Sequence, residues 1–187
     1  MKPEAVLAIE HMKTTIDQIQ KKLRETEFFL AKMTDQEARA FGDKEPFDFY
    51  LSAFLSAGMS VRDGLFKGQI PDPNRTITEW RSRWKKTRTE GELCLFDFMG
   101  KDRDVEVHGS GSRRKPKEEP FTVFGNSYSD KSGTLTIFAA PATGPTFVCK
   151  SAYYFIIGGT DRNVIEATNE YLVLLNHMVA EFCRACE

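Results

Sequence analysis

A group of charged side chains near residue 105 has the residue types and spacing that suit acid–base chemistry. Arg103, Asp104 and His108 lie within the segment RDVEVH. If the segment is helical, Asp104 lies one turn before His108, so its carboxylate can accept the imidazole N–H and leave the other ring nitrogen as a base. An imidazole base can take the proton of a ribose 2′-hydroxyl while an arginine holds the phosphate. These three are the predicted catalytic residues of a metal-free RNA cleavage.

The helical repeat limits what this group can do within one chain. One polar stripe is predicted, at steps of four, three and four residues: Asp97, Lys101, Asp104 and His108. Arg103 precedes His108 by five residues, which places it about 140 degrees away around the helix axis. Only the long arginine side chain, or a second copy of the helix, brings the two groups together. The alternative is a solvated helix end, where the helix dipole favours His108.

Two basic segments could bind the RNA backbone. Residues 75–88 carry six basic residues against one acid, Glu79, with Trp80 and Trp84 one turn apart. Cations interleaved with aromatic rings can bind phosphates and stack bases. The alternative is that both indoles face the core and the cations form its solvated side. The predicted RNA-binding residues are Arg81, Arg83, Lys85, Lys86, Arg88, Arg113, Arg114 and Lys115.

The second basic segment, 111–120, is expected to be a linker. It overlaps the run GSGS at 109–112, which ends a helix and is flexible, and it contains two glutamates beside its cations. A flexible basic arm next to a ribonuclease-like site raises the local RNA concentration. An ordinary exposed linker is the equal alternative.

The four cysteines indicate neither a metal site nor a disulfide framework. Cys183 and Cys186 have metal-ligand spacing, but the sequence has no second such pair or matching histidine pair. A domain of this size does not need disulfides. Reduced thiols, no metal and no cofactor are expected.

Apolar periodicity and the placement of Pro and Gly predict the elements that position these side chains. Helices are expected over residues 3–33, 47–66, 78–88, 91–108 and 160–183. Thr160 and Asp161 are expected to cap the last helix. The second helix carries small residues that permit a close helix crossing: Ser52, Ala53, Ser56, Ala57, Gly58 and Ser60.

Between residues 121 and 158 the pattern changes to β-rich runs separated by turn residues, FTVFGNSY, TLTIFAA and TFVCKSAYYFII. The predicted fold is therefore mainly α: a four-helix bundle of the first, second, fourth and last helices, with a small antiparallel three-stranded meander before the last helix. One domain, 1–187, is expected. Its parts are a helical core at 1–110, a basic linker at 111–120, the meander at 121–158 and a bundle helix at 160–186.

Composition excludes several classes of protein. With 41% hydrophobic residues and fifteen phenylalanines among 187 residues, the chain can fill a core and is not disordered as a whole. A net charge of −1 gives no global attraction to nucleic acid, so RNA binding must come from a local patch. A membrane span and a secretory signal are both absent from the sequence pattern. A cytoplasmic protein without membrane association is expected.

The motif at 103–108 resembles the R-x4-6-H motif of the HEPN superfamily, helical-bundle proteins that include metal-independent endoribonucleases of toxin systems. Asp104 stands where that family usually has Asn. The segment FDFYLSAFLSAGMSVRDGL at 47–65 is similar to the second helix of a bacterial branch, and its spacing through a Trp-containing helix to the motif also fits. The resemblance covers roughly residues 1–110. The strands at 121–158 are not part of the core family pattern.

The resemblance implies a homodimer in which two motifs face each other and form a composite site. It also implies RNA as the substrate, a 2′,3′-cyclic phosphate as the product end, and a cognate antitoxin or other protein as a partner. Because the superfamily contains many non-catalytic members, an interaction or sensor module of the same fold is the alternative.

Overall fold

The computed structural model describes residues 3–38, 44–68, 70–72, 74–108, 114–123, 128–130, 133–135 and 146–186. Five α-helices dominate this part of the chain: Pro3–Glu37 (α1), Lys44–Lys67 (α2), Thr76–Trp84 (α3), Glu90–His108 (α4) and Val164–Cys186 (α5). A short 3-10 turn, Lys85–Thr87 (η1), follows α3. The prediction of a mainly α chain is confirmed. None of the described helices combines the length and the apolar composition that crossing a bilayer requires.

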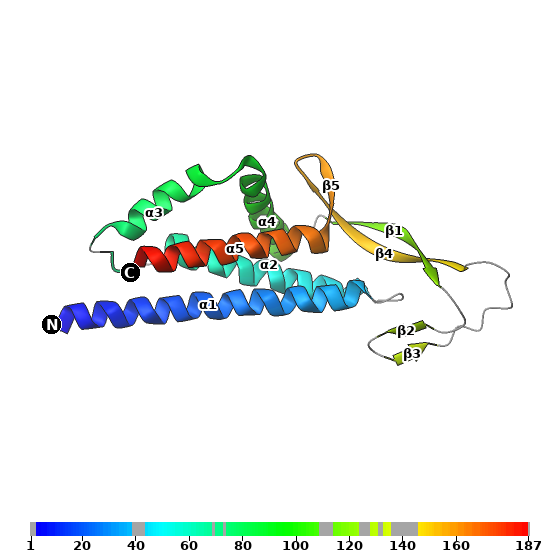
Figure 1. The fold of residues 1–187 in the computed structure, drawn as a ribbon, viewed down its shortest axis with the longest axis horizontal. Helices are drawn as coiled ribbons and strands as arrows, with labels where there is room; N and C mark the ends of the chain where they lie inside the picture. The colour runs from blue at the N-terminus through cyan, green and yellow to red at the C-terminus, as the bar shows by residue number, and fades with distance from the viewer. Residues whose placement is uncertain are drawn as a thin grey trace.

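Three of the helices run side by side, and a fourth crosses them. Figure 1 shows α1, α2 and α5 lying along one another, with α3 near the C-terminal end of α5. The motif helix α4 crosses α2 and α5 instead of running along them. The mainly α class is thus established, whereas the finer assignment to a HEPN-like four-helix bundle remains a proposal.

The small residues of α2 allow it to pack closely within the chain. A Cβ atom on Gly64 would lie 2.7 Å from Cγ1 of Ile19 on α1. A Cβ on Gly58 would lie 3.0 Å from Cε1 of Tyr171 on α5. Both contacts are tighter than a side chain tolerates without movement. The predicted close crossing is therefore confirmed, and α2 lies between α1 and α5.

An aromatic cluster joins α2, α3, α4 and α5. The ring of Phe66 stacks on Trp80 at 5.5 Å between centroids, and Trp84 lies 4.9 Å from Phe96. Phe182 of α5 contacts Trp80 edge-on at 5.4 Å. Offset and edge-to-face pairs of this kind contribute about 0.5–1.5 kcal/mol each beyond burial. The cluster therefore fixes α3 and α4 against the other helices.

Polar caps set where two of these helices begin. Oδ1 and Oδ2 of Asp72 accept hydrogen bonds from the backbone N–H groups of Ile77 and Thr78 at 3.2 and 2.7 Å, which starts α3. Oδ1 of Asn163 accepts from the N–H groups of Ile165 and Glu166 at 2.8 and 3.2 Å, which starts α5. These bonds satisfy backbone donors that have no partner within the helix.

The predicted cap of the last helix is wrong, because residues 160–163 form a strand. Thr160–Asn163 (β5) pairs antiparallel with Thr146–Ile157 (β4). Gly158 and Gly159 connect the two strands with φ values of 60 and 83 degrees. Two consecutive positive φ values define the tight turn that suits the twist of a hairpin. The chain therefore continues as a strand before α5 begins at Val164.

The predicted meander is also wrong in its order and its start. The sheet has the order β1-β4-β5, where β1 is Lys115–Val123 and pairs antiparallel with β4. Tyr128–Asp130 (β2) and Gly133–Leu135 (β3) form a separate two-stranded pair. The pairing of β1 with β4 joins segments that are distant in sequence, whereas β2–β3 and β4–β5 pair as neighbours. The predicted linker at 111–120 gives way to strand β1 from Lys115 onward, while residues 111–113 lie outside the described part.

Candidate functional site

A partly buried arginine holds the helix that carries the motif. Nη1 of Arg62, on α2, donates a hydrogen bond to the Phe96 carbonyl at 2.7 Å, and the guanidinium lies 3.6 Å from the centroid of the Phe96 ring. Arg62 also hydrogen-bonds Tyr171, whose pKa burial raises to about 12. One turn along α4, a Cβ on Gly100 would lie only 2.4 Å from Nη1 of Arg62. The missing side chain makes room for the guanidinium and fixes the rotation of α4 about its axis.

This rotation divides the motif region between core and surface. Asp102 is fully buried, whereas the side chain of Arg103 is 31% exposed and that of Asp104 is 62% exposed. Nη1 of Arg103 donates to Oδ1 of Asp104 at 3.2 Å. Nε of Arg103 is buried and has no hydrogen-bond partner among the described residues. The guanidinium therefore has donor capacity left after pairing with Asp104.

The predicted polar stripe on α4 is confirmed over the part that the structure describes. Asp97, Lys101 and Asp104 are all exposed. His108 is the last residue of α4, and its side chain lies outside the described part of the chain. The contact between Asp104 and His108 therefore stays a prediction.

The aromatic residues of the segment 75–88 belong to the core. Trp80 and Trp84 are 8% and 1% exposed, so the alternative of buried indoles is confirmed and base stacking on them is wrong. Arg81 closes the end of α2: its Nε and Nη2 donate to the carbonyls of Leu65 and Gly68 at 2.7 and 2.9 Å. These two hydrogen bonds hold α3 against the C-terminal end of α2.

Arg88 is also engaged within the chain. Its Nη2 donates to Oε1 of Glu181 on α5 at 2.8 Å, and its guanidinium lies 5.4 Å from the Trp84 ring. Glu181 in turn accepts a bond from Nε1 of Trp80 at 3.3 Å. Arg81 and Arg88, both predicted to bind RNA, thus have their donors directed at other helices.

The remaining predicted cations of this segment face solvent. Arg83, Lys85 and Lys86 are exposed. Arg83 lies 4.0 Å from Glu79, and Lys85 lies 3.8 Å from Asp97, so both ion pairs are at the long limit of the range. Exposed pairs of this kind contribute little, about 0–1 kcal/mol. These cations remain accessible to a polyanion.

Arg114 is fixed and partly buried, which differs from the flexible arm that was expected. It forms an ion pair with Asp48 of α2, and its guanidinium lies 4.6 Å from the Tyr153 ring and 5.8 Å from the Phe47 ring. Burial lowers the pKa of Arg114. The exposed Lys115 begins β1, and Arg113 lies outside the described residues.

The cysteine pair at the end of α5 is partly buried. Cys94, Cys183 and Cys186 form no disulfide among the described residues, and burial raises the pKa of Cys186 to about 11. A thiol with a raised pKa is a weak nucleophile and a weak metal ligand at neutral pH. Among the described residues, no group of three or more His, Cys, Asp or Glu is arranged to hold a metal ion.

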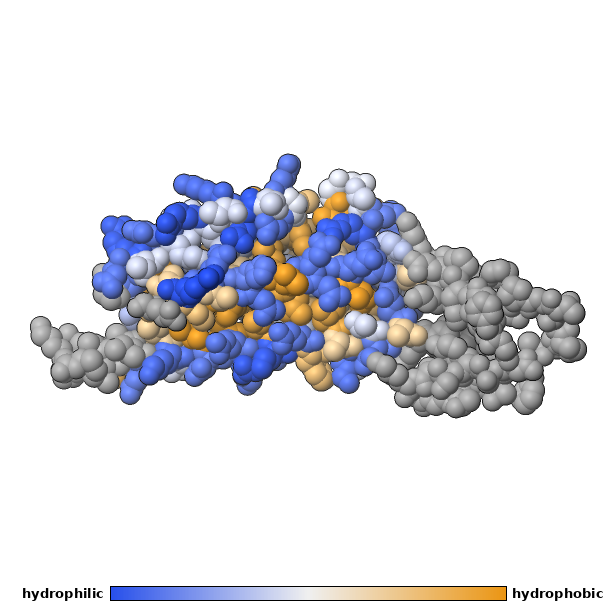
Figure 2. Space-filling view, in the orientation of Figure 1, coloured by the Kyte–Doolittle hydropathy of each residue, from blue (hydrophilic) through white to orange (hydrophobic). Residues whose placement is uncertain are grey.

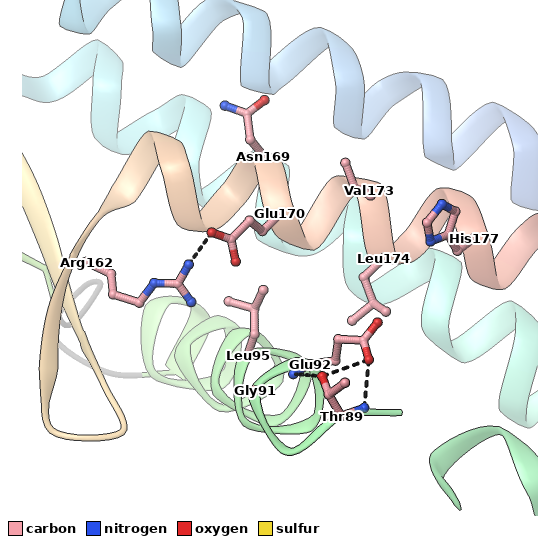
Figure 3. Close-up of a pocket in the computed structure, with 10 residues that line it drawn as sticks. All are labelled: Thr89, Gly91, Glu92, Leu95, Arg162, Asn169, Glu170, Val173, Leu174 and His177. Atoms are coloured by element: carbon pink, nitrogen blue, oxygen red, sulfur yellow. Dashed lines mark hydrogen bonds and ion pairs between the residues drawn. The ribbon is translucent and has the colours of Figure 1, made fainter. Parts of the chain in front are cut away.

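A groove of about 500 Å³ lies between the start of α4 and α5, with β5 at one end (Figure 3). Arg162 of β5 and Glu170 of α5 form an ion pair across one end. Leu95 and Leu174 lie between that pair and Glu92. The remaining lining residues are Thr89, Gly91, Asn169, Val173 and His177.

The carboxylate of Glu92 is tied to the start of α4. It accepts hydrogen bonds from the backbone N–H and the hydroxyl of Thr89 at 2.7 and 2.9 Å, and Thr89 accepts from the Glu92 N–H at 3.2 Å. These bonds, aided by the charges of Arg88 and His177, lower the pKa of Glu92. The reciprocal arrangement is a capping box.

Sequence reasoning did not find the groove, because its lining residues come from three separate elements. Arg162 and Glu170 are eight residues apart and meet only because β5 turns back over α5. The T-x-x-E pattern of Thr89 and Glu92 was a local signal for the start of a helix. It carried no information about the groove.

Comparison of the chain with models of protein families, with curated proteins and with solved structures found no match.

Proposed function

We propose that this chain is a HEPN-like RNA-binding protein that acts as a homodimer and cleaves RNA without a metal, using Arg103 and His108. The observation that carries the proposal is the arrangement at the end of α4. Arg103 is partly exposed and has unused donor capacity, and the exposed Asp104 lies beside it. The neighbouring Asp102 is fully buried, whereas Arg103 and Asp104 are accessible at 31% and 62% of their side chains.

The proposed reaction is an attack within the RNA strand. His108 takes the proton of the 2′-hydroxyl, and the 2′-oxygen forms a bond to the adjacent phosphorus. The bond from phosphorus to the 5′-oxygen breaks, and that oxygen takes up a proton. The product ends are a 2′,3′-cyclic phosphate and a 5′-hydroxyl. Arg103 stabilises the charge that develops on the phosphate oxygens, and Asp104 orients the imidazole.

The dimer belongs to the proposal because of helix geometry. On one α4 helix, Arg103 and His108 are about 140 degrees apart around the axis and about 7.5 Å apart along it. A two-fold axis near the end of α4 brings Arg103 of one protomer near His108 of the other. A cognate antitoxin or another protein partner would cover the same end of the helix.

Single substitutions in the purified protein test this chemistry. Arg103→Ala and His108→Ala are each expected to lower RNA cleavage at least about a hundredfold, because they remove charge stabilisation and the base. Asp104→Ala is expected to lower it only in part, since Asp104 orients a neighbour. Cleavage in excess EDTA and end-group analysis of the products measure the metal requirement and the cyclic phosphate.

The matched control is Arg24→Ala, which removes an exposed arginine on α1 and should leave cleavage unchanged. Equal activity of wild type and His108→Ala would point to a contaminating nuclease. If the wild-type protein cleaves neither structured nor single-stranded RNA, the catalytic proposal is wrong, and the non-catalytic function described next is favoured.

A non-catalytic interaction or sensor module is the second candidate function, and the groove favours it. Its floor is apolar at Leu95 and Leu174, and its ends carry the Arg162–Glu170 pair and Glu92. A concave site with an apolar floor and a few polar groups is typical of ligand sites. An NMR titration with a ligand would test this function. Chemical-shift changes at the groove residues, with no change at Arg103, would support it.

A further inference from the structure

We infer that the outward face of α3 and η1 binds the phosphate backbone of single-stranded RNA through Arg75, Arg83 and Lys86. This surface, called the α3 basic face below, rests on the proposed RNA-binding function and adds the place where the strand lies. It excludes Arg81 and Arg88, whose donors are directed at other helices. It adds Arg75, which composition and spacing did not single out.

The three cations lie on one side of the segment. Taken as a continuous helix, the three cations span about 80 degrees of its surface, and the two indoles lie further round, with Trp80 about 60 degrees from Arg83. The structure agrees, because the three cations are exposed and the two indoles are buried. Figure 2 shows a mostly hydrophilic surface over the α3 region, at the upper left. At about 1.5 Å per residue, the α3 basic face is about 16 Å long.

The nearby acids do not neutralise these cations. Asp72 is engaged in the cap of α3, and Glu181 binds Arg88 and Trp80. Glu79 lies on the same face, but its 4.0 Å distance from Arg83 makes it a weak partner. The side chains of Arg75 and Lys86 make no hydrogen bond or ion pair with any residue that the structure describes. A local excess of positive charge therefore remains, and it attracts a polyanion.

Arg75 supplies a second and independent observation. Its φ of 61 and ψ of 13 degrees lie in the left-handed region, and it is the only described non-glycine residue with a positive φ. Residues with a Cβ are strained in that conformation, and glycine is not. The Arg75 side chain is exposed, so packing does not explain the arginine. Strained residues concentrate at functional positions, and an anion-binding role for Arg75 fits its exposure and its charge.

Binding can be measured apart from cleavage with a fluorescent 2′-O-methyl oligouridine, which lacks the attacking hydroxyl. For the full chain, Arg75→Ala, Arg83→Ala and Lys86→Ala are each expected to weaken affinity about three- to tenfold. Each should also lower the slope of log affinity against log salt by about 0.7, the value for one lost phosphate contact on a single strand. Arg75→Lys should retain affinity, and Arg24→Ala should equal wild type.

Arg75→Gly separates binding from strain. Glycine removes both the charge and the strain, so affinity should fall as in Arg75→Ala while Tm rises by about 2 °C. Arg75→Ala keeps the strained backbone and should show no rise in Tm. If Arg75→Gly raises Tm and leaves affinity and salt slope unchanged, the α3 basic face is not the binding surface.

The two proposals fail in different ways. Normal affinity for the 2′-O-methyl strand together with no cleavage of unmodified RNA would overturn the proposed chemistry and leave the α3 basic face standing. Cleavage that persists when all three cations are replaced, with unchanged affinity, would overturn the α3 basic face alone. A wild-type protein that binds no RNA would overturn both.

Discussion

At the scale of single residues, the position of the motif depends on a polar contact in the core. Arg62 reaches from α2 to the Phe96 carbonyl and to Tyr171, and it occupies the space that a side chain at position 100 would fill. Buried polar groups of this kind are unfavourable unless their hydrogen bonds are made. Gly100 is thus a structural requirement for the Arg62 contacts.

Two glycines of α4 provide a matched pair of substitutions. Gly91→Ala adds a methyl group with nothing within 4 Å, so the gain in helix propensity should raise the free energy of unfolding by about 0.5–1 kcal/mol. Gly100→Ala displaces Arg62 and breaks its partly buried hydrogen bonds, so the free energy of unfolding should fall by about 1–2 kcal/mol despite the same propensity gain. Urea unfolding measures both. Equal stabilisation by the two substitutions would show that Arg62 is not held in place.

At the scale of elements, local polar caps decide where the helices start. The Thr89–Glu92 capping box begins α4, and the lowered pKa of Glu92 couples this start to pH. The ordinary pKa of a glutamate carboxyl is 4.5. A carboxylate whose pKa is lower than this in the folded protein stabilises the fold at every pH above 4.5, and the stabilisation is lost as the pH falls through the folded-state pKa. The start of α4 should therefore weaken in acid.

Glu92→Gln separates the charge from the cap. Glutamine can still accept the Thr89 N–H, so the helix start is kept while the titration is removed. At pH 7 the variant should be less stable than wild type, and the difference should shrink as pH falls below 4.5. Thr89→Ala should lower stability by about 1 kcal/mol through loss of the cap itself. Thermal unfolding across this pH range checks both, and a constant difference between Glu92→Gln and wild type would contradict the linkage.

The elements also show how far the sequence could predict this fold. Helix positions followed from apolar periodicity, because each helix buries one face and local spacing records it. Strand pairing did not, because β1 and β4 are joined by contacts between distant segments that no local pattern records. The start of α5 was misplaced for a related reason. Thr160 and Asp161 resemble a cap, but pairing with β4 and the Gly158-Gly159 turn place them in a strand.

The candidate site was predictable to a similar extent. The exposed stripe on α4 followed from helical spacing alone. The roles of Arg81, Arg88 and Arg114 did not, because their partners are a carbonyl, a carboxylate and aromatic rings on other elements. The sequence does not show whether a basic side chain faces solvent or binds the carbonyl groups at the end of a helix. Backbone strain at Arg75 has no sequence pattern at all.

At the scale of the whole molecule, the proposed chemistry requires two copies of the chain. Large apolar side chains remain exposed on the described helices, including Phe28 and Phe49 at 54% and 63%. Light scattering after size exclusion should report about twice 21.3 kDa. A strictly monomeric species at micromolar concentration would remove the composite site, because Arg103 and His108 of one chain lie on different sides of α4.

The pairing of β1 with β4 also separates the helical part of the protein from the segment between these two strands. The ladder runs from Lys115 opposite Tyr154 to Val123 opposite Thr146, so the chain leaves the sheet and re-enters it at neighbouring positions. The pair β2–β3 is therefore inserted between two points that the ladder already holds together. A two-residue Asn-Gly turn could close the same hairpin, and foreign sequence could be inserted there without separating α4 from α5.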